Sequence, residues 1–121
     1  MVLKGIVTSG MGTAKMWVGM VEKAFEEKTN IKLYNGTLNI KLKEDYKIEP
    51  DFIIFPHEFG GNQNVLVKKC KILGIEAFAV RAEKNQIGTG DYDLKTLEIV
   101  SNINFRETFN LKDNQEISVE I

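Results

Sequence analysis

The sequence is poor in the residues on which several common kinds of protein depend. Its 121 residues include one cysteine and one histidine. A single cysteine, Cys70, cannot form an internal disulfide, so a reducing compartment is favoured. A single histidine cannot build a histidine-based metal cluster. These counts argue against a disulfide-stapled secreted domain and against a metal centre made of histidines.

Long apolar runs are also missing. The longest, such as residues 52–55, are far shorter than the roughly 20 residues that cross a bilayer. The first residues lack the apolar stretch and the cleavage site of a secretory signal. We therefore expect a cytoplasmic protein with no membrane partner.

An excess of positive charge is absent as well. Sixteen Lys and Arg residues stand against seventeen Asp and Glu residues, which gives a net charge of −1. Proteins that bind nucleic acids normally present a basic stripe. Here basic and acidic residues are interleaved, as in Lys43-Glu44-Asp45. We therefore expect no nucleic acid among the partners.

The rest of the composition is that of an ordinary folded domain. Apolar residues make up 43% and charged residues 27% of the chain, which matches globular proteins. A chain of this length usually organises one core. We expect one domain over residues 1–121. Because no exposed apolar seam is evident, we expect a monomer or a weak homo-oligomer.

The hydrophobic pattern predicts one long helix and many short strands. Helical spacing over residues 14–28 predicts an apolar face made of Trp17, Met20, Val21, Ala24 and Phe25. A single helical turn is expected within residues 104–110. Extended segments are expected at residues 3–8, 31–34, 37–42, 52–55, 65–73, 75–83, 97–101 and 117–121. This pattern favours a mainly β fold, a small closed or nearly closed barrel with one main helix after the first strand.

A glycine-rich turn lies between the first strand and the helix. It reads Ser9-Gly10-Met11-Gly12, and Lys15 follows in the first turn of the helix. The glycines let backbone amides approach a ligand, and the helix N-terminus and Lys15 add positive charge. This arrangement suits a phosphate, although it lacks the Walker A spacing. A plain strand-to-helix turn would have the same composition.

Thr37 and Asn39 form a second candidate site. On a strand they point to one face, whereas Leu38 and Ile40 point to the other. Their hydroxyl and amide oxygens could hold a hard cation such as Mg²⁺, provided that a nucleotide brings negative charge with it. An amphipathic strand with both side chains in solvent is the alternative.

Glu98 lies inside the apolar run of residues 97–100. Its carboxylate either faces solvent from a strand or is held for a ligand that donates an N–H group. The second arrangement has a desolvation cost that a good partner must offset.

Together these segments resemble the archaeal CTP-dependent riboflavin kinase family. Three motifs occur in the family's order, and the resemblance spans nearly the whole chain. They are Ser9-Gly10-Met11-Gly12 with Lys15, Gly36-Thr37-Leu38-Asn39-Ile40-Lys41-Leu42, and Phe105-Arg106-Glu107-Thr108-Phe109-Asn110-Leu111-Lys112-Asp113. The resemblance implies a six-stranded barrel of the cradle-loop type. It also implies Mg²⁺-dependent transfer of the γ-phosphate of CTP to the 5′-hydroxyl of riboflavin, which gives FMN and CDP.

The resemblance also implies roles for individual residues, although it names no general base. Thr37 and Asn39 would be the Mg²⁺ ligands, and Glu98 would contact the flavin. The nucleotide would be bound by Met11, Gly12, Thr13, Ala14, Lys15, Met16, Ile103, Asn104, Phe105 and Arg106.

The chain departs from the family pattern at two positions of the expected sites. Where the family usually has a threonine before the flavin-contacting glutamate, this chain has Gly90, with Thr89 beside it. A glycine that the family often carries in the phosphate loop is Ala14 here. The first departure leaves open a non-catalytic barrel that binds flavin or nucleotide without transferring phosphate.

Overall fold

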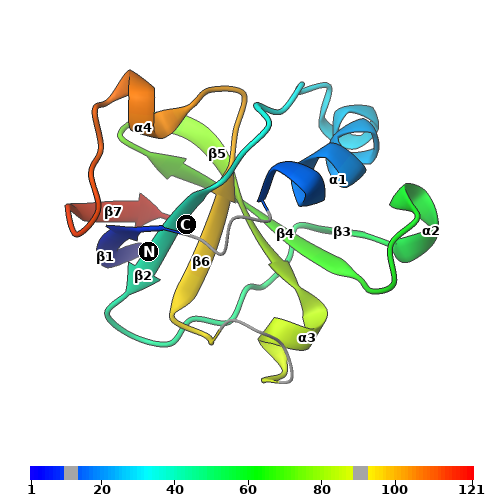
Figure 1. The fold of residues 1–121 in the computed structure, drawn as a ribbon. Helices are drawn as coiled ribbons and strands as arrows, with labels where there is room; N and C mark the ends of the chain where they lie inside the picture. The colour runs from blue at the N-terminus through cyan, green and yellow to red at the C-terminus, as the bar shows by residue number, and fades with distance from the viewer. Residues whose placement is uncertain (10–13, 89–92) are drawn as a thin grey trace.

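A computed structural model describes residues 1–9, 14–88 and 93–121, with residues 14–17 described by their backbone alone. Within that part of the chain, seven strands alternate with one long helix and three short ones (Figure 1). The strands are β1 (Val2–Thr8), β2 (Leu38–Leu42), β3 (Phe52–Ile54), β4 (Val65–Ile72), β5 (Ile75–Ala82), β6 (Thr96–Val100) and β7 (Glu116–Glu120). The helices are α1 (Ala14–Thr29), α2 (Pro56–Phe59), α3 (Glu83–Gln86) and α4 (Phe105–Thr108).

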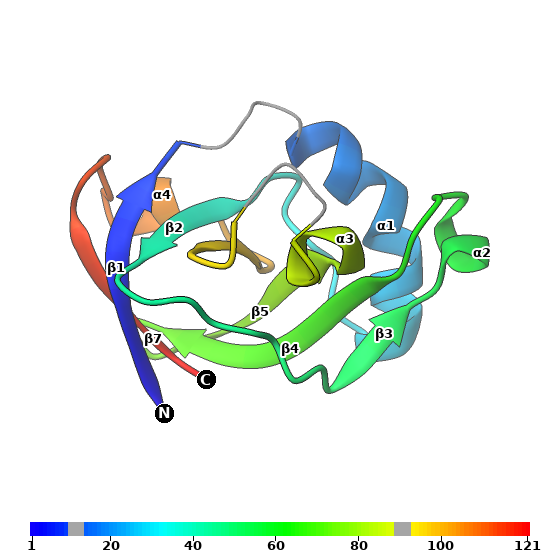
Figure 2. The ribbon, with the colours of Figure 1, turned by 90° about the horizontal axis from the view of Figure 1, so that it is seen from below.

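Six of the seven strands close into an antiparallel barrel, as Figure 2 shows in profile. Their order is β4-β5-β6-β2-β1-β7, and the pairing of Lys71 in β4 with Glu120 in β7 closes the ring. The seventh strand, β3, pairs with the first residues of β4 and extends the sheet beyond the barrel. The prediction of a mainly β, six-stranded barrel is confirmed.

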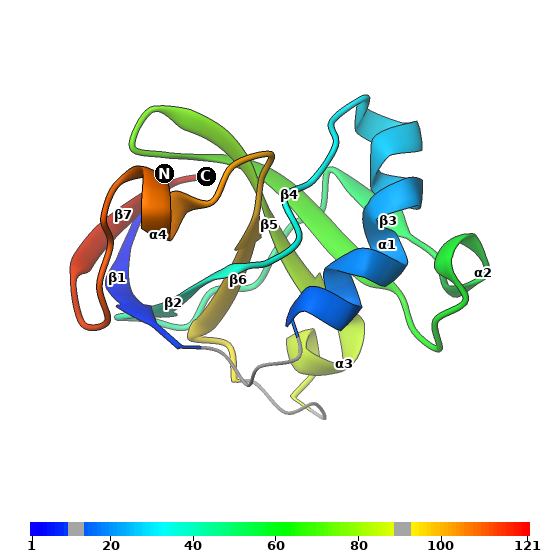
Figure 3. The same cartoon turned by 45° about the horizontal axis from the view of Figure 1, so that its top comes forward.

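Two apolar clusters lie on opposite faces of the sheet. The first fills the barrel interior and includes Val7, Ile40, Leu97 and Ile99. The second lies between α1 and the outer face of the extended sheet, where α1 is visible beside the barrel in Figure 3. Because successive strand residues point to opposite faces, β5 contributes to both clusters and is buried on both sides.

The helix α1 buries Val18, Val21, Ala24 and Phe25 against the sheet. The ring of Phe25 meets Phe78 edge-on, with centroids 4.9 Å apart. The predicted apolar face is therefore correct at Val21, Ala24 and Phe25. It is wrong at Met20, which is 44% exposed, because the buried stripe of the helix passes through Val18 instead.

The expected strands agree with the structure to within one residue at each end, with one exception. Residues 31–34 form no strand but cross from α1 to β2 as irregular chain. Leu33 is buried under α1, and the backbone N–H of Tyr34 donates to the Ser101 carbonyl at 2.8 Å. One such bond holds the segment without forming a ladder. None of the described helices is long and apolar enough to cross a membrane.

Candidate functional site

Polar side chains form a row across the outer face of three neighbouring strands. Thr8 in β1 pairs with Asn39 in β2, and Asn39 pairs with Glu98 in β6. The next residue in the row is Val80 in β5, which packs beneath α1. Directly paired residues of an antiparallel sheet point to the same face, with Cβ atoms about 4.5–5.5 Å apart. The row therefore brings Asn39 and Glu98 together.

A cavity of about 470 Å³ opens beside this row. Its walls come from the end of β1, the segment that enters β2, and the chain from β6 into α4. The lining residues are Thr8, Ser9, Tyr34, Asn35, Gly36, Thr37, Leu38, Asn39, Ile99, Ser101, Ile103, Asn104, Phe105, Arg106 and Glu107. A volume of this size is typical of small-molecule sites.

Asn39 carries a buried oxygen that lacks a partner. Its side chain is 6% exposed, and its Nδ2 donates to the Thr37 hydroxyl at 3.2 Å. Among the described residues its Oδ1 accepts no hydrogen bond. An orphaned amide oxygen next to a hydroxyl is a donor set that suits a hard cation, so these two residues fit Mg²⁺. No group of three His, Cys, Asp or Glu side chains in the described chain could hold a metal, so charge would have to come from a ligand.

Glu98 lies beside Asn39 but does not line the cavity. Burial raises the pKa of its carboxyl to about 7, and the positive charge of Arg81 partly opposes this rise. A half-buried carboxylate is costly to keep without a donor. The position therefore suits a ligand that brings an N–H or O–H group to the sheet.

Arg106 links α4 to the end of β1. Its Nη2 donates to the Thr8 carbonyl at 3.0 Å and to Asp113 Oδ1 at 2.6 Å. The other oxygen of Asp113 accepts from the Ser9 hydroxyl at 2.9 Å. The hydrogen bond from Arg106 lowers the pKa of Asp113 most, and the hydrogen bond from Ser9 lowers it further. The network fixes Ser9, the first residue of the glycine-rich turn.

Tyr34 and Asn104 form the opposite wall of the cavity. The Nδ2 of Asn104 donates to the Tyr34 hydroxyl at 3.0 Å, and its Oδ1 accepts from the Glu107 backbone, capping α4. A side chain on Gly36 would meet the Tyr34 ring at 3.0 Å, so glycine allows the ring to lie there. The sequence analysis missed Tyr34, for which its position before the Asn35-Gly36 turn was the only available signal.

The structure brings many of the predicted site residues together. Thr37 and Asn39 line the same cavity as Ile103, Asn104, Phe105 and Arg106. Ala14, Lys15 and Met16 form the start of α1. The remaining predicted residues, Met11, Gly12, Thr13, Thr89 and Gly90, lie outside the described residues.

Comparison with protein families gives one matching family model. It is described as the domain of unknown function DUF120, carries the short name CTP-dep_RFKase, and matches residues 7–121. The match therefore covers nearly the whole chain, including both walls of the cavity.

Curated relatives point to the same group. A protein named riboflavin kinase from Staphylothermus marinus is 31% identical over 98% of this chain and 90% of its own length. One of the same name from Methanococcus vannielii is 33% identical over 90% of this chain and 88% of its own. A third, from Methanococcus maripaludis, is 30% identical over 97% of both chains. With a barrel of the expected topology and a cavity at the expected motifs, the chain belongs to the DUF120 family of CTP-dependent riboflavin kinases.

Proposed function

We propose that the protein transfers the γ-phosphate of CTP to the 5′-hydroxyl of riboflavin, giving FMN and CDP with the help of Mg²⁺. The observation that carries the proposal is the convergence of Thr37 and Asn39 with residues 103–106 on one cavity. Family membership and the name riboflavin kinase of the relatives support the reaction.

The nucleotide would lie between α4 and the start of α1. Residues 103–106 line the cavity and would hold the nucleoside part. Backbone N–H groups in the first turn of α1 are free of helical partners and carry a partial positive charge, which suits the phosphates. The same proposal assigns Met11, Gly12, Thr13, Ala14, Lys15 and Met16 to the phosphates. Positioning and charge neutralisation would supply most of the rate enhancement.

Thr37 and Asn39 would hold Mg²⁺ through the hydroxyl oxygen and the orphaned amide oxygen. The bound ion would neutralise phosphate charge during transfer. Both ligands are neutral, so we expect the metal to bind together with the nucleotide and only weakly without it.

Riboflavin would lie on the Glu98 side of the row. Because Glu98 pairs with Asn39, its carboxylate would meet the flavin close to the phosphates. It would accept a hydrogen bond from a hydroxyl or N–H group of the flavin, which would offset its desolvation. By the family resemblance, Thr89 and Gly90 would also contact the flavin on this side.

An assay of nucleotide preference tests the reaction. The purified protein is incubated with riboflavin, Mg²⁺ and each of CTP, ATP, GTP and UTP, and FMN is followed by chromatography. We expect FMN chiefly with CTP. Saturable binding of riboflavin or CDP without FMN from any nucleotide would refute the kinase and favour the non-catalytic binding barrel.

Variants of the proposed metal ligands test the site. Thr37→Ala and Asn39→Ala should weaken use of Mg²⁺–CTP by about tenfold or more, since even outer partners of metal ligands typically contribute that much. Thr37→Ser keeps the hydroxyl and serves as the matched control. Riboflavin affinity should change little in all three variants. An unaltered Mg²⁺ dependence in both alanine variants would remove the metal assignment.

A further inference from the structure

A single arginine is buried at the end of the barrel near α3. Arg81 is 3% exposed and follows Ala77 and Ala79 on the face of β5 that points into the barrel. Its cross-strand partner is Leu66, a residue of the interior cluster. An apolar side chain would fill this position at a lower desolvation cost. The presence of an arginine here must therefore be explained by the contacts of its guanidinium group.

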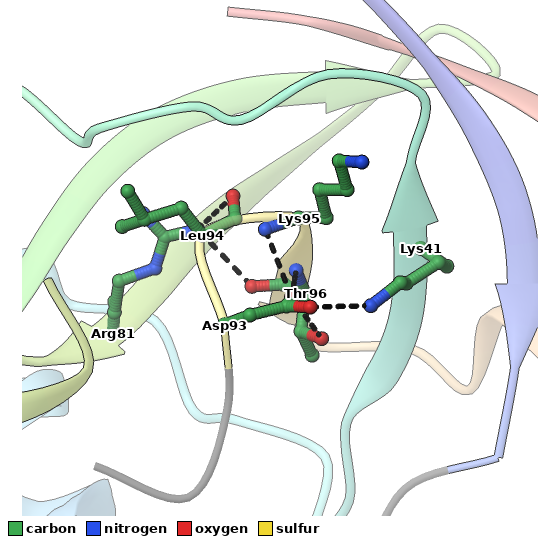
Figure 4. Close-up of polar contacts among 6 residues, drawn as sticks. All are labelled: Lys41, Arg81, Asp93, Leu94, Lys95 and Thr96. Atoms are coloured by element: carbon green, nitrogen blue, oxygen red, sulfur yellow. Dashed lines mark hydrogen bonds and ion pairs between the residues drawn. The ribbon is translucent and has the colours of Figure 1, made fainter. Parts of the chain in front are cut away.

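The guanidinium group of Arg81 joins three separate segments. Its Nη1 donates to the Tyr46 carbonyl and, at 2.9 Å, to Gln86 Oε1 at the end of α3. Its Nη2 donates to the carbonyls of Leu94 at 3.3 Å and Thr96 at 3.1 Å, where β6 begins (Figure 4). All four acceptors are neutral oxygens, and no described carboxylate forms an ion pair with Arg81.

The start of β6 is also bonded by Asp93. Its Oδ1 accepts from the backbone N–H groups of Lys95 at 3.0 Å and Thr96 at 3.1 Å. Its Oδ2 accepts from Lys41 Nζ in β2 at 2.7 Å, as Figure 4 shows. Asp93 and Arg81 thus bond different groups of one short stretch of backbone, Asp93 its N–H groups and Arg81 its carbonyls.

This stretch determines where β6 lies against β2. Thr96 pairs with Lys41, and two residues further along Glu98 pairs with Asn39. On the other side of the connecting segment, Gln86 exchanges hydrogen bonds with the backbone of Ile48, at 2.9 and 3.2 Å. Arg81 therefore ties together the two ends of the α3–β6 connection.

We propose that Arg81 is a positioning residue for riboflavin: it fixes the start of β6 relative to the end of α3, and so the place of Glu98 in the row. The inference rests on the proposed function, in which Glu98 contacts the flavin. A planar group with five donors can serve carbonyls from several directions at once, which a lysine cannot do. The nucleotide side of the cavity, built from residues 34–39 and 101–107, contains none of the contacts of Arg81.

The test compares Arg81→Met and Arg81→Lys with the wild-type protein. Riboflavin affinity is measured by quenching of flavin fluorescence, and CDP affinity by calorimetry with Mg²⁺ present. Val119→Ala, a buried position in β7 away from the cavity, is the control for a general loss of stability. Backbone hydrogen exchange over residues 86–88 and 93–96 is compared in all four proteins.

Both Arg81 variants should lose riboflavin affinity by about tenfold or more, because small displacements of binding groups are costly. CDP affinity should stay within about twofold of wild type, and exchange over residues 86–88 and 93–96 should accelerate. The control should show neither effect. Should Arg81→Met fail to fold, Gln86→Ala removes one acceptor of Arg81 together with the two hydrogen bonds to Ile48, keeps the bonds of Arg81 to β6, and should give a smaller loss of the same kind.

Wild-type riboflavin affinity in a folded Arg81→Met variant would overturn the inference and leave the proposed function intact. Equal losses of riboflavin and CDP would also overturn it, since they would indicate a general structural role. A wild-type protein that binds no riboflavin would instead refute the proposed function, and the inference with it.

Discussion

Replacing Glu98 with glutamine should change how the stability of the ligand-free protein depends on pH. Burial raises the pKa of Glu98 to about 7, whereas a glutamate in an unfolded chain titrates at about 4.3. Between these values the folded protein holds a proton that the unfolded chain has released. Stability from this group is therefore fully present below about pH 4 and is lost as the pH rises through 7. The difference corresponds to about 2.5 kcal/mol between pH 5 and pH 8.5.

The assay is urea unfolding of wild type and Glu98→Gln at several pH values without nucleotide or flavin. The free energy of unfolding of wild type, minus that of the variant, should fall by about 2.5 kcal/mol from pH 5 to pH 8.5. Glu116→Gln, on the exposed side of β7, is the matched control and should give a flat difference. A flat difference for Glu98→Gln as well would show that its carboxyl is well hydrated, and the argument for a ligand beside Asn39 would fail.

Three other substitutions or reagents test neighbouring parts of the site. Asn39→Leu removes a buried unpaired oxygen and should raise the free energy of unfolding of the ligand-free protein by about 1 kcal/mol. It should also abolish the effect of Mg²⁺ on CDP affinity. A variant that urea unfolding shows to be destabilised would contradict this. Asp113→Ala should weaken CDP binding by about threefold in calorimetry, since it frees Arg106, and leave riboflavin binding unchanged. Burial raises the pKa of the Cys70 thiol to about 12. A thiol reagent at pH 8 should therefore label the folded protein at least about a hundredfold more slowly than the unfolded one. Fast labelling of the folded protein would show that β4 opens.

The sequence predicted the barrel well because the pattern of strands is local information. Alternation along residues 38–42 placed Leu38 and Ile40 on one face and Asn39 on the other, and the structure confirms that they lie on opposite faces. The strand predicted at residues 31–34 was wrong. The apolar residues there fit a strand pattern, but the backbone makes a single hydrogen bond to Ser101 in place of a ladder. The prediction that Met20 is buried was wrong. The helix sequence allows two neighbouring rows of apolar residues to form the buried face, and only packing against the sheet selects the row with Val18.

The site residues that lie within one sequence motif could be predicted. Those that come together only through the pairing of distant strands could not. Thr37 and Asn39 stood out within one motif, but nothing local says that Glu98 is the cross-strand neighbour of Asn39. The role of Arg81 was also hidden, because its partners come from three segments, and Tyr46 and Thr96 lie 35 and 15 residues from it in the sequence. Its one signal was a charged residue at an inward position of a strand.

On the Glu98 side of the site, folding and ligand choice depend on opposite faces of the sheet. The interior cluster holds the six strands together, whereas the row from Thr8 to Glu98 lies on the outer face. Exchanging outer residues for others of similar size leaves the packing inside the barrel untouched. The same barrel could therefore adopt new ligands on this side by substitutions on its outer face.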